Sequence, residues 1–286
     1  MEQFVNYLFQ IGFSFSIFVL IGLGLAIIFG MMRVINLAQG ELLMLGAYFC
    51  TLCVHSGINL WLAIPLSAIA VGVFGILIER LVIQWLYGRI LDTLLATWGL
   101  SLLLIGGVTS IFGPQTESIA TPLSSIHIGE LSIPVYGLFI IASALIMLVT
   151  VYTLWKHSKV GLIVRSTMQN PKAAAALGIN QNRVYMLTFG FGAMLTGLSG
   201  ALLVPIVGAY PTLGIVYVAK SFITVISGGH LPLLGTSTAS LLFGTIDGVI
   251  ATISTSVIGE ISVLLLAIVL LRVLPLGITA KINRGI

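Results

Sequence analysis

The residue types that could carry chemistry are few, and they lie in short polar groups within apolar sequence. One group is Cys50, Cys53 and His55, and its C-x-x-C spacing is typical of a redox or metal site in a soluble protein. Two thiols and one imidazole supply only three ligands, and a buried cysteine usually packs as a small apolar residue. We therefore expect packing at these positions and no metal site.

The motifs of enzymes and nucleotide-binding proteins are absent from the sequence. It has no G-x-x-x-x-G-K-[ST] loop, no H-E-x-x-H pair and no recognisable Ser/His/Asp arrangement. We expect a chain that is not an enzyme and binds no cofactor itself.

Two polar interruptions of apolar sequence resemble each other. VINLAQGELLMLGAY begins at Val34 and VISGGHLPLLGTSTA begins at Val225, and each places small polar residues around glycine before a Leu-rich turn. We interpret them as a weak internal repeat with broken or re-entrant segments around 36–46 or 225–236. Paired interruptions point to a substrate pathway in transporters built from repeats, although plain loops outside the membrane are the structural alternative. The predicted pathway residues are Asn36, Gln39, Glu41, Thr97, Ser227, Gly228, Gly229 and His230.

Asp247 lies in the middle of the apolar run FGTIDGVIATIS. A carboxylate at membrane depth is by default a functional candidate. Pairing with Lys220, another charged residue inside apolar sequence, is the structural alternative.

Composition predicts the elements that must position these residues. Of the 286 residues 58% are hydrophobic and 7% are charged, and the mean hydropathy is +1.18. A soluble domain is usually about a quarter charged. We predict a single transmembrane domain over residues 1–286, all-α and polytopic, with roughly eight to ten spans of ~20 residues. The expected spans are 11–32, 37–54, 61–80, 93–112, 135–155, 184–206 and three more within 212–276, broken at 228–230 and near Gly259.

The distribution of basic residues orients these spans. Residues 156–183 contain five Lys or Arg and no acid, whereas the loop 113–134 has two acids and no Lys or Arg. Basic loops face the cytoplasm. With nine crossings, the N-terminus lies outside, in the periplasm, and the C-terminus lies in the cytoplasm, where Arg33 is also expected.

The basic loop contains a short helix signal. Pro171 can open a helix at its first turn, Ala173–Ala176 favour helix, and Gly178 can end it. A helix this short is marginal alone and becomes ordered in a groove of another protein. A solvated helix without a partner is the alternative.

Three stretches resemble the inner-membrane permease subunits of branched-chain amino acid and urea or amide ABC transporters. They are GMMRVINLAQGELLMLGAY, the loop containing KAAAALGI, and ISGGHLPLLGT. The loop containing KAAAALGI is similar to the segment by which ABC permeases dock on their ATPase subunits. In the family that segment has Glu-Ala-Ala, then any three residues, then Gly. Here Lys172 replaces the Glu, which changes any salt bridge to the ATPase. The resemblance implies ATPase-coupling residues Arg165, Pro171, Lys172, Ala173, Ala174 and Gly178.

The resemblance also implies partners and a substrate. LDTLLATWGLSL is similar to the urea branch, so we expect import of urea or a short amide, with branched-chain amino acids as the alternative. The implied partners are a second permease subunit of the same fold, two cytoplasmic ATPase subunits and a periplasmic substrate-binding protein, all at the bacterial inner membrane. Two alternative functions belong to other classes of membrane protein. One is an ATP-independent channel or secondary carrier, and the other is a scaffolding subunit.

Overall fold

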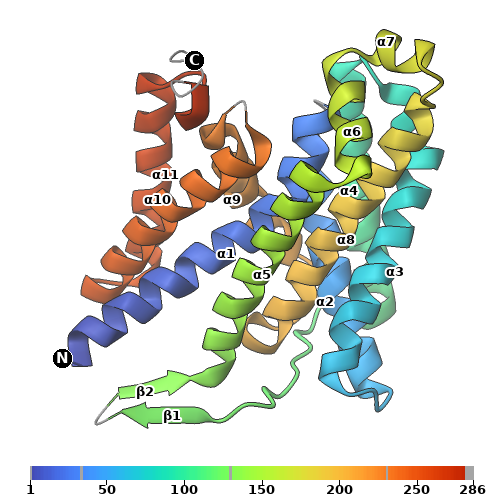
Figure 1. Ribbon diagram of the computed structural model, residues 1–286. Coiled ribbons are helices and arrows are strands. Elements are labelled where there is room, and N and C mark those ends of the chain that lie inside the picture. The colour runs from blue at the N-terminus through green and yellow to red at the C-terminus, as the bar shows by residue number, and fades with distance from the viewer. Residues whose placement is uncertain (1, 33–34, 129–130, 230, 281–286) are drawn as a thin grey trace. The chain divides into compact units, whose positions relative to one another are not determined.

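The structure, a computed structural model, describes residues 2–32, 35–128, 131–229 and 231–280. These residues form eleven α-helices, two short 3₁₀ helices and one two-stranded hairpin (Figure 1). The prediction of an all-α polytopic membrane protein is confirmed. The α-helices are α1 (Glu2–Met32), α2 (Gln39–His55), α3 (Leu60–Leu81), α4 (Ile90–Phe112), α5 (Val135–His157), α6 (Lys159–Gln169), α7 (Pro171–Ala176), α8 (Gln181–Val207), α9 (Leu213–Gly228), α10 (Pro232–Ile253) and α11 (Ser256–Val273).

Seven of the described helices are long and apolar enough to cross a membrane, namely α1, α3, α4, α5, α8, α10 and α11. The helices α2, with 17 residues, and α9, with 16, are slightly shorter than the ~20 residues that usually span a bilayer. The chain is therefore a multi-pass membrane protein. A total of nine crossings, which needs α2 and α9, stays a prediction.

One expected boundary is wrong, and one pair of strands was not expected. The last break lies at residues 254–255 rather than near Gly259, because the side chain of Thr255 accepts a hydrogen bond from the Ile258 amide and so begins α11. The loop 113–134 also contains a hairpin of β1 (Ser125–Ile128) and β2 (Leu131–Pro134), with Ile126 opposite Ile133. The hairpin was missed because its strands have only four residues each.

The segment 36–46 does not fold back on itself. The chain turns only before Gln39, and α2 then continues as a regular helix to His55. The polar residues Gln39, Gly40 and Glu41 thus occupy the first helical turn and do not interrupt the helix. The second segment breaks after Gly228, where α9 ends, and α10 begins at Pro232. Arg33, His230, Lys281 and Arg284 lie outside the described residues.

The chain divides into two compact units. The first unit contains Met1–Gly22, Thr121–Val149 and Lys220–Ile286, and the second contains Leu23–Ala120 and Thr150–Ala219. Each is treated below by itself. A single transmembrane domain over residues 1–286 stays a prediction.

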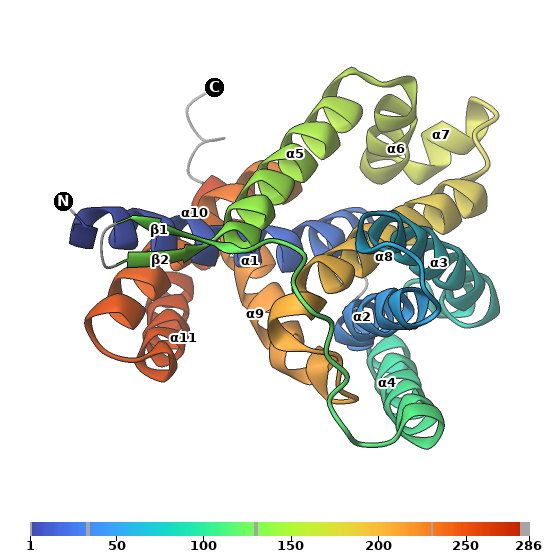
Figure 2. The same cartoon turned by 90° about the horizontal axis from the view of Figure 1, so that it is seen from below.

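In the second unit, α2, α3 and α8 lie side by side and α4 lies beside α2 (Figures 1 and 2). Glycine makes this packing possible. A methyl group at Gly46 of α2 would overlap the carbonyl oxygen of Gly197 in α8, and one at Gly200 would overlap that of Leu43. Small residues hold membrane helices together because lipid gives no hydrophobic drive between them.

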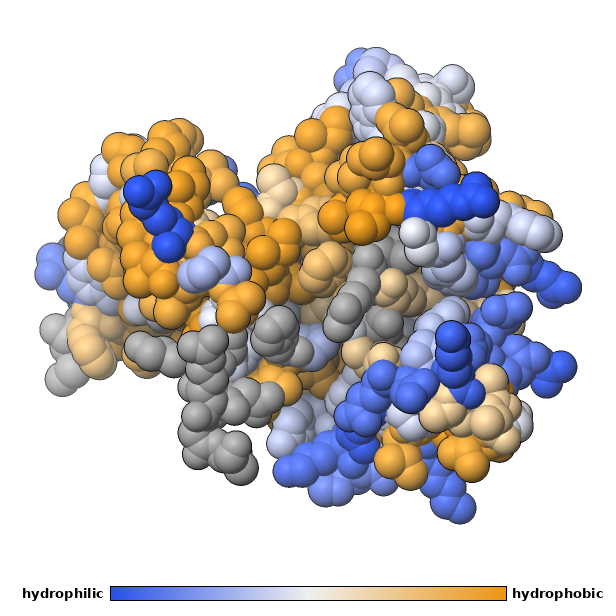
Figure 3. Space-filling model, turned by 90° about the horizontal axis from the view of Figure 1, so that it is seen from above, coloured by the Kyte–Doolittle hydropathy of each residue, from blue (hydrophilic) through white to orange (hydrophobic). Residues whose placement is uncertain are grey.

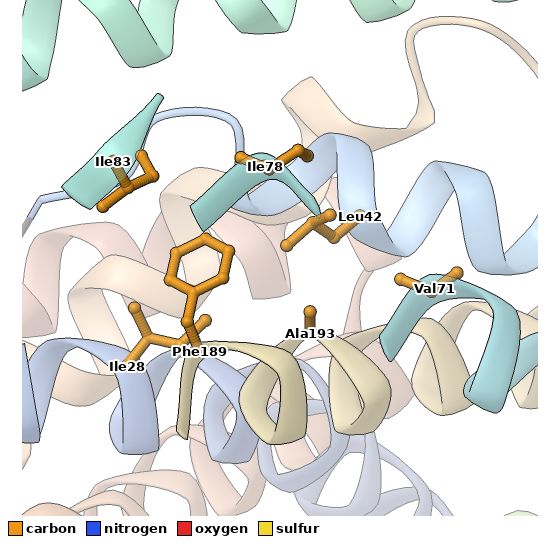
Figure 4. Close-up of a cluster of buried hydrophobic side chains, with 7 residues drawn as sticks. All are labelled: Ile28, Leu42, Val71, Ile78, Ile83, Phe189 and Ala193. Atoms are coloured by element: carbon orange, nitrogen blue, oxygen red, sulfur yellow. The ribbon is translucent and has the colours of Figure 1, made fainter. Parts of the chain in front are cut away.

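A cluster of buried apolar side chains fills the space between these helices (Figure 4). Its members come from α1, α2, α3, α8 and the 3₁₀ turn Ile83–Leu86 that follows α3, so the cluster joins parts of the chain that are far apart in the sequence. The cluster fixes the start of α2 against α8. Its members are Ile28, Leu42, Val71, Ile78, Ile83, Phe189 and Ala193.

In the first unit, α10 packs against α11 and against the start of α1, where Gly244 and Gly248 lie on the backbone of Phe15 and Ile11. Lys220 Nζ lies 2.8 Å from Glu260 Oε1, which joins α9 to α11. Asp247 accepts a hydrogen bond from Ser14. Lys220 thus forms an ion pair with Glu260 and is also close enough to Asp247 for their charges to attract each other, as the structural alternative for Asp247 named.

Candidate functional site

The start of α2 gathers polar side chains from three helices of the second unit. Asn36 is 1% exposed, and its Oδ1 accepts a hydrogen bond from the Ala38 amide at 3.1 Å while its carbonyl oxygen accepts one from Gln39 N. This geometry is that of a turn closed by an Asn side chain. Asn36 thus shapes the entry into α2, and its amide oxygen is already engaged.

Gln39 connects this turn to α8. Its Nε2 donates to Thr196 Oγ1 at 2.6 Å, and Thr196 in turn donates to the Gly192 carbonyl at 2.9 Å. The other end of the amide, Gln39 Oε1, is buried and has no hydrogen-bond partner among the described residues. Buried polar groups normally have at least one partner, so this oxygen is an exception that calls for an explanation.

Glu41 is 2% exposed and is half satisfied. Its Oε1 accepts a hydrogen bond from Ser101 in α4, but its Oε2 has no partner among the described residues. Gly214, in the first turn of α9, lies against the free oxygen, since a methyl group there would overlap Oε2. One carboxylate oxygen is thus held by Ser101, whereas the other is buried against Gly214 without a hydrogen-bond donor among the described residues.

The α4 side of the site consists of two residues one turn apart. Thr97 Oγ1 accepts from the Leu37 amide at 3.2 Å and donates to the Thr93 carbonyl at 2.8 Å. Ser101, four positions later and so on the same helix face, holds Glu41. We call the following residues the α2 polar cluster: Asn36, Gln39, Glu41, Thr97, Ser101 and Thr196.

The structure therefore brings together four of the residues that the sequence predicted, namely Asn36, Gln39, Glu41 and Thr97. Ser101 and Thr196 were not predicted as members of the site. Ser101 could have been found from its spacing to Thr97, but no local pattern links Thr196 to a glutamine 157 positions earlier.

Tyr48 is a further residue that the sequence did not single out. It lies seven positions after Glu41, on the same face of α2, and is 2% exposed. Its ring packs on Phe112 with centroids 4.8 Å apart, and its hydroxyl has no hydrogen-bond partner among the described residues. One face of α2 thus carries two buried oxygens, Glu41 Oε2 and Tyr48 Oη, that have no hydrogen-bond partner in the part of the chain that the structure describes.

Glu79 of α3 is a useful comparison, because it is also 2% exposed. Its Oε1 accepts a hydrogen bond from Tyr87 at 2.6 Å. Burial, followed by the hydrogen bond and the charge of Glu79, raises the pKa of Tyr87, so the phenol stays a donor. Glu79 has its own partner near the end of α3 and needs no ligand.

The other predicted pathway residues belong to the first unit. Gly228 presents its carbonyl oxygen to Thr279 Oγ1 at 2.6 Å, and Gly229, with φ of +87°, packs on Gly277. Ser227 is fully buried, and its Oγ has no partner among the described residues. His230 lies outside the described residues. The two glycines have a packing role here, and any part in a pathway stays a prediction.

The predicted coupling helix forms as expected. Asn170 caps α7 by accepting from the Ala173 amide at 3.0 Å, Pro171 occupies the first turn, and Gly178 follows the end with φ of +83°. Gln181 Nε2 donates to the Pro171 carbonyl and ties α7 to α8. Lys172 and Ala173 are exposed and Ala174 is buried against the protein.

Arg165 takes a different position from the rest of the coupling group. Its guanidinium donates to the carbonyl of Trp155, so it joins α6 to the end of α5. This contact gives it a structural role within the loop. Its role in meeting an ATPase stays a prediction.

Comparison with known proteins adds the family. The family profile described as "Branched-chain amino acid transport system / permease component" matches residues 7–274. The high-affinity branched-chain amino acid transport system permease protein LivH of Salmonella typhimurium is 27% identical, over 98% of this chain and 97% of its own length. LivH of Escherichia coli K12 is 26% identical over the same shares.

BraD of Pseudomonas aeruginosa, also named a high-affinity branched-chain amino acid transport system permease protein, is 27% identical over 91% of this chain and 88% of its own length. No solved structure matches the chain. These relatives are transport subunits and not enzymes, in agreement with the motifs that the sequence lacks. The match covers nearly the whole length, including the α2 polar cluster and α7. The chain therefore belongs to the family of permease components of branched-chain amino acid transport systems.

Proposed function

We propose that this chain is the permease subunit of an ABC importer for branched-chain amino acids. The proposal replaces urea, which the sequence favoured, by its alternative. It is supported by relatives that match end to end and are named for branched-chain amino acid transport. The urea reading rests on LDTLLATWGLSL and on the argument that a neutral substrate needs only hydrogen-bond partners, which Asn36, Gln39 and Thr97 could supply.

The observation that carries the proposal is the free carboxylate oxygen of Glu41. A buried acceptor without a donor costs about 1–3 kcal/mol, and more when it is charged. The α-ammonium group of an amino acid has three donors and a positive charge, so it can satisfy Glu41 Oε2. Urea also donates hydrogen bonds but carries no charge. A carboxylate at this position therefore favours an ammonium-bearing substrate.

Transport is proposed to depend on partners. Two cytoplasmic ATPase subunits would bind ATP and Mg²⁺ and would dock on α7, whose exposed Lys172 and Ala173 face away from the protein. Their movement would rock the helices, so that the pathway opens first to one side of the membrane and then to the other. A second permease subunit and a periplasmic binding protein complete the proposed importer, which lies in the bacterial inner membrane.

The test is reconstitution of this chain in vesicles with its cognate ATPase, partner permease and binding protein. We expect ATP-dependent uptake of labelled leucine and no uptake of labelled urea above vesicles that lack the permease. Uptake of urea but not leucine would overturn the substrate proposal. Leucine uptake by this chain alone, without ATPase, would instead support a channel or secondary carrier.

Docking through α7 is tested separately. Gly178→Pro should uncouple ATP hydrolysis from uptake, because proline cannot adopt the φ of +83° that turns the chain after α7. The matched control is Gly88→Pro, at another turn with φ of +83° that lies outside the basic loop. Normal coupling in assembled Gly178→Pro complexes would rule out the docking role.

A further inference from the structure

A cavity of about 420 Å³ lies in the second unit, at the ends of two membrane-spanning helices. The end of α5, α6, the start of α8 and Ile27 of α1 line it. Apart from a few polar groups its lining is aliphatic or aromatic, and it includes Leu154, Val160, Val184, Leu187 and Phe191. The volume falls within the range of small-molecule sites, although this cavity is separate from the α2 polar cluster.

The depth of the cavity follows from the residues at its mouth. Trp155 lies in the last turn of α5, and Arg183 lies in the first turn of α8. Trp at the end of a span sits at the level of the lipid headgroups, and Arg beside it reaches the aqueous side. At the end of the molecule that carries α7, hydrophilic surface lies beside hydrophobic surface (Figure 3). The cavity thus opens where acyl chains meet headgroups.

An apolar lining alone cannot select an occupant in a bilayer, because the surrounding lipid is equally apolar. Selection must come from charge. Arg183 is exposed, and no carboxylate among the described residues forms an ion pair with it. The segment 156–183 contains no acid at all. Arg165 does not line the cavity, and its guanidinium donates to the Trp155 carbonyl.

We propose that this cavity is a binding site for an anionic phospholipid. One acyl chain lies between α5, α6 and α8, and the phosphate pairs with the Arg183 guanidinium. Guanidinium binds phosphate bidentately and stays charged at every relevant pH. The helix α6 forms one wall of the site. Its exposed Val160 and Leu162 place α6 in the membrane interface, in the leaflet that contains Arg183.

The site would connect lipid composition to the coupling segment. Ser158 caps α6 by accepting from the Gly161 amide at 2.9 Å, and α6 leads through Asn170 directly into α7. A bound lipid that fills the space behind α6 would hold this pair of helices against α8. This arrangement makes the lipid a positional support for α7, independent of which substrate is transported.

The test uses the full-length chain purified in detergent, with retention of phosphatidylglycerol and of phosphatidylcholine with the same acyl chains measured by native mass spectrometry. We expect about fivefold preference for phosphatidylglycerol, as expected for one basic side chain beside an anionic headgroup. Arg183→Gln should abolish this preference, and Arg183→Lys should retain most of it. The control is Arg89→Gln, at an exposed arginine outside the cavity that pairs with Asp92.

A second variant tests the cavity itself. Leu187→Trp, at a side chain that is 59% exposed, should fill the opening and lower retention of both lipids without unfolding the chain. Equal retention of the two lipids by the unmodified chain would overturn the proposal. So would an equal loss in Arg89→Gln and Arg183→Gln, which would indicate a general attraction to basic charge. If Leu187→Trp instead dissociates a dimer and leaves lipid retention unchanged, a second copy covers this face.

Discussion

Buried carboxylates in the second unit differ in whether their oxygens are satisfied. Glu79 has Tyr87 as a donor, whereas Glu41 has Ser101 on one oxygen and no partner among the described residues on the other. A protein gains no stability from a buried acceptor that lacks a donor, so such a group is retained for another reason. At membrane depth the usual reason is function.

Glu41→Gln is the residue-scale prediction. The substitution keeps the size of the side chain and the contact with Ser101 but removes the charge that would attract an ammonium group. A hydrogen bond to a charged group contributes about 1.5–3 kcal/mol, so we expect leucine uptake to fall at least tenfold in reconstituted importer. Assembly with the partners should be normal.

The control is Ser101→Ala, which keeps the carboxylate and removes only the neutral donor that already satisfies Oε1. Its effect on uptake should be clearly smaller than that of Glu41→Gln. Leucine uptake that is unchanged in Glu41→Gln would remove the ammonium-binding role of this residue. A loss of the same size in both variants would assign Glu41 to packing between α2 and α4.

At the scale of single elements, the sequence predicts a helix well wherever the signals are local. The helix α7 is an example, since Asn170, Pro171 and Gly178 are all within nine positions and each has a defined role at a helix end. The pairing of helices is harder. Gly46 and Gly197 meet across 151 positions, and the sequence marks both only as small residues.

The same limit explains what was missed in the α2 polar cluster. Asn36, Gln39 and Glu41 were predictable because polar residues stand out in an apolar run. Thr196 was not, because its hydroxyl resembles any other threonine in a membrane helix that bonds its own backbone. The break near Gly259 was predicted wrongly because glycine was weighted as a helix end, whereas here it lies inside α11 and Thr255 caps the helix.

Packing of α2 on α8 gives the element-scale prediction. Gly200→Ala should destabilise the protein by about 1–3 kcal/mol, because the new methyl group would overlap the Leu43 carbonyl and force the two helices apart. The matched control is Gly106→Ala in α4, where no atom lies within 4 Å of the added methyl group. There alanine should be neutral or slightly stabilising, since it favours helix over glycine.

Thermal unfolding in detergent measures the difference between the two variants. We expect a lower midpoint for Gly200→Ala and an unchanged or higher midpoint for Gly106→Ala. Equal midpoints would contradict close packing of α2 against α8 at this level. The comparison is informative because both substitutions add one methyl group to a helical glycine.

At the scale of the whole molecule, composition was sufficient for the class of protein but not for the number of crossings. Hydropathy identifies seven long helices directly. The helix α2 begins with Gln39, Gly40 and Glu41, so its apolar part is short, and α9 has only 16 residues. Each helix that crosses the membrane puts the next loop on the opposite side. The side of every loop after α2 or α9 therefore depends on whether that helix crosses.

Crossing by α2 makes a prediction that can be measured loop by loop. With the N-terminus outside, α1 reaches the cytoplasm, and α2 returns the chain to the outside at residues 56–59. Gln115, after α4, then also lies outside, and Leu177, after α5, lies in the cytoplasm with α7. All three loop positions, Ser56, Gln115 and Leu177, are exposed.

Single cysteines at Ser56, Gln115 and Leu177, in a chain with Cys50→Ala and Cys53→Ala, report these sides through a membrane-impermeant thiol reagent. In intact cells we expect labelling at Ser56→Cys and Gln115→Cys and none at Leu177→Cys until the membrane is opened. If α2 did not cross, Ser56 would share the side of the N-terminal end of α2, and Gln115 and Leu177 would exchange sides. Basic residues argue against that outcome, because it would move the five Lys and Arg of residues 156–183 out of the cytoplasm.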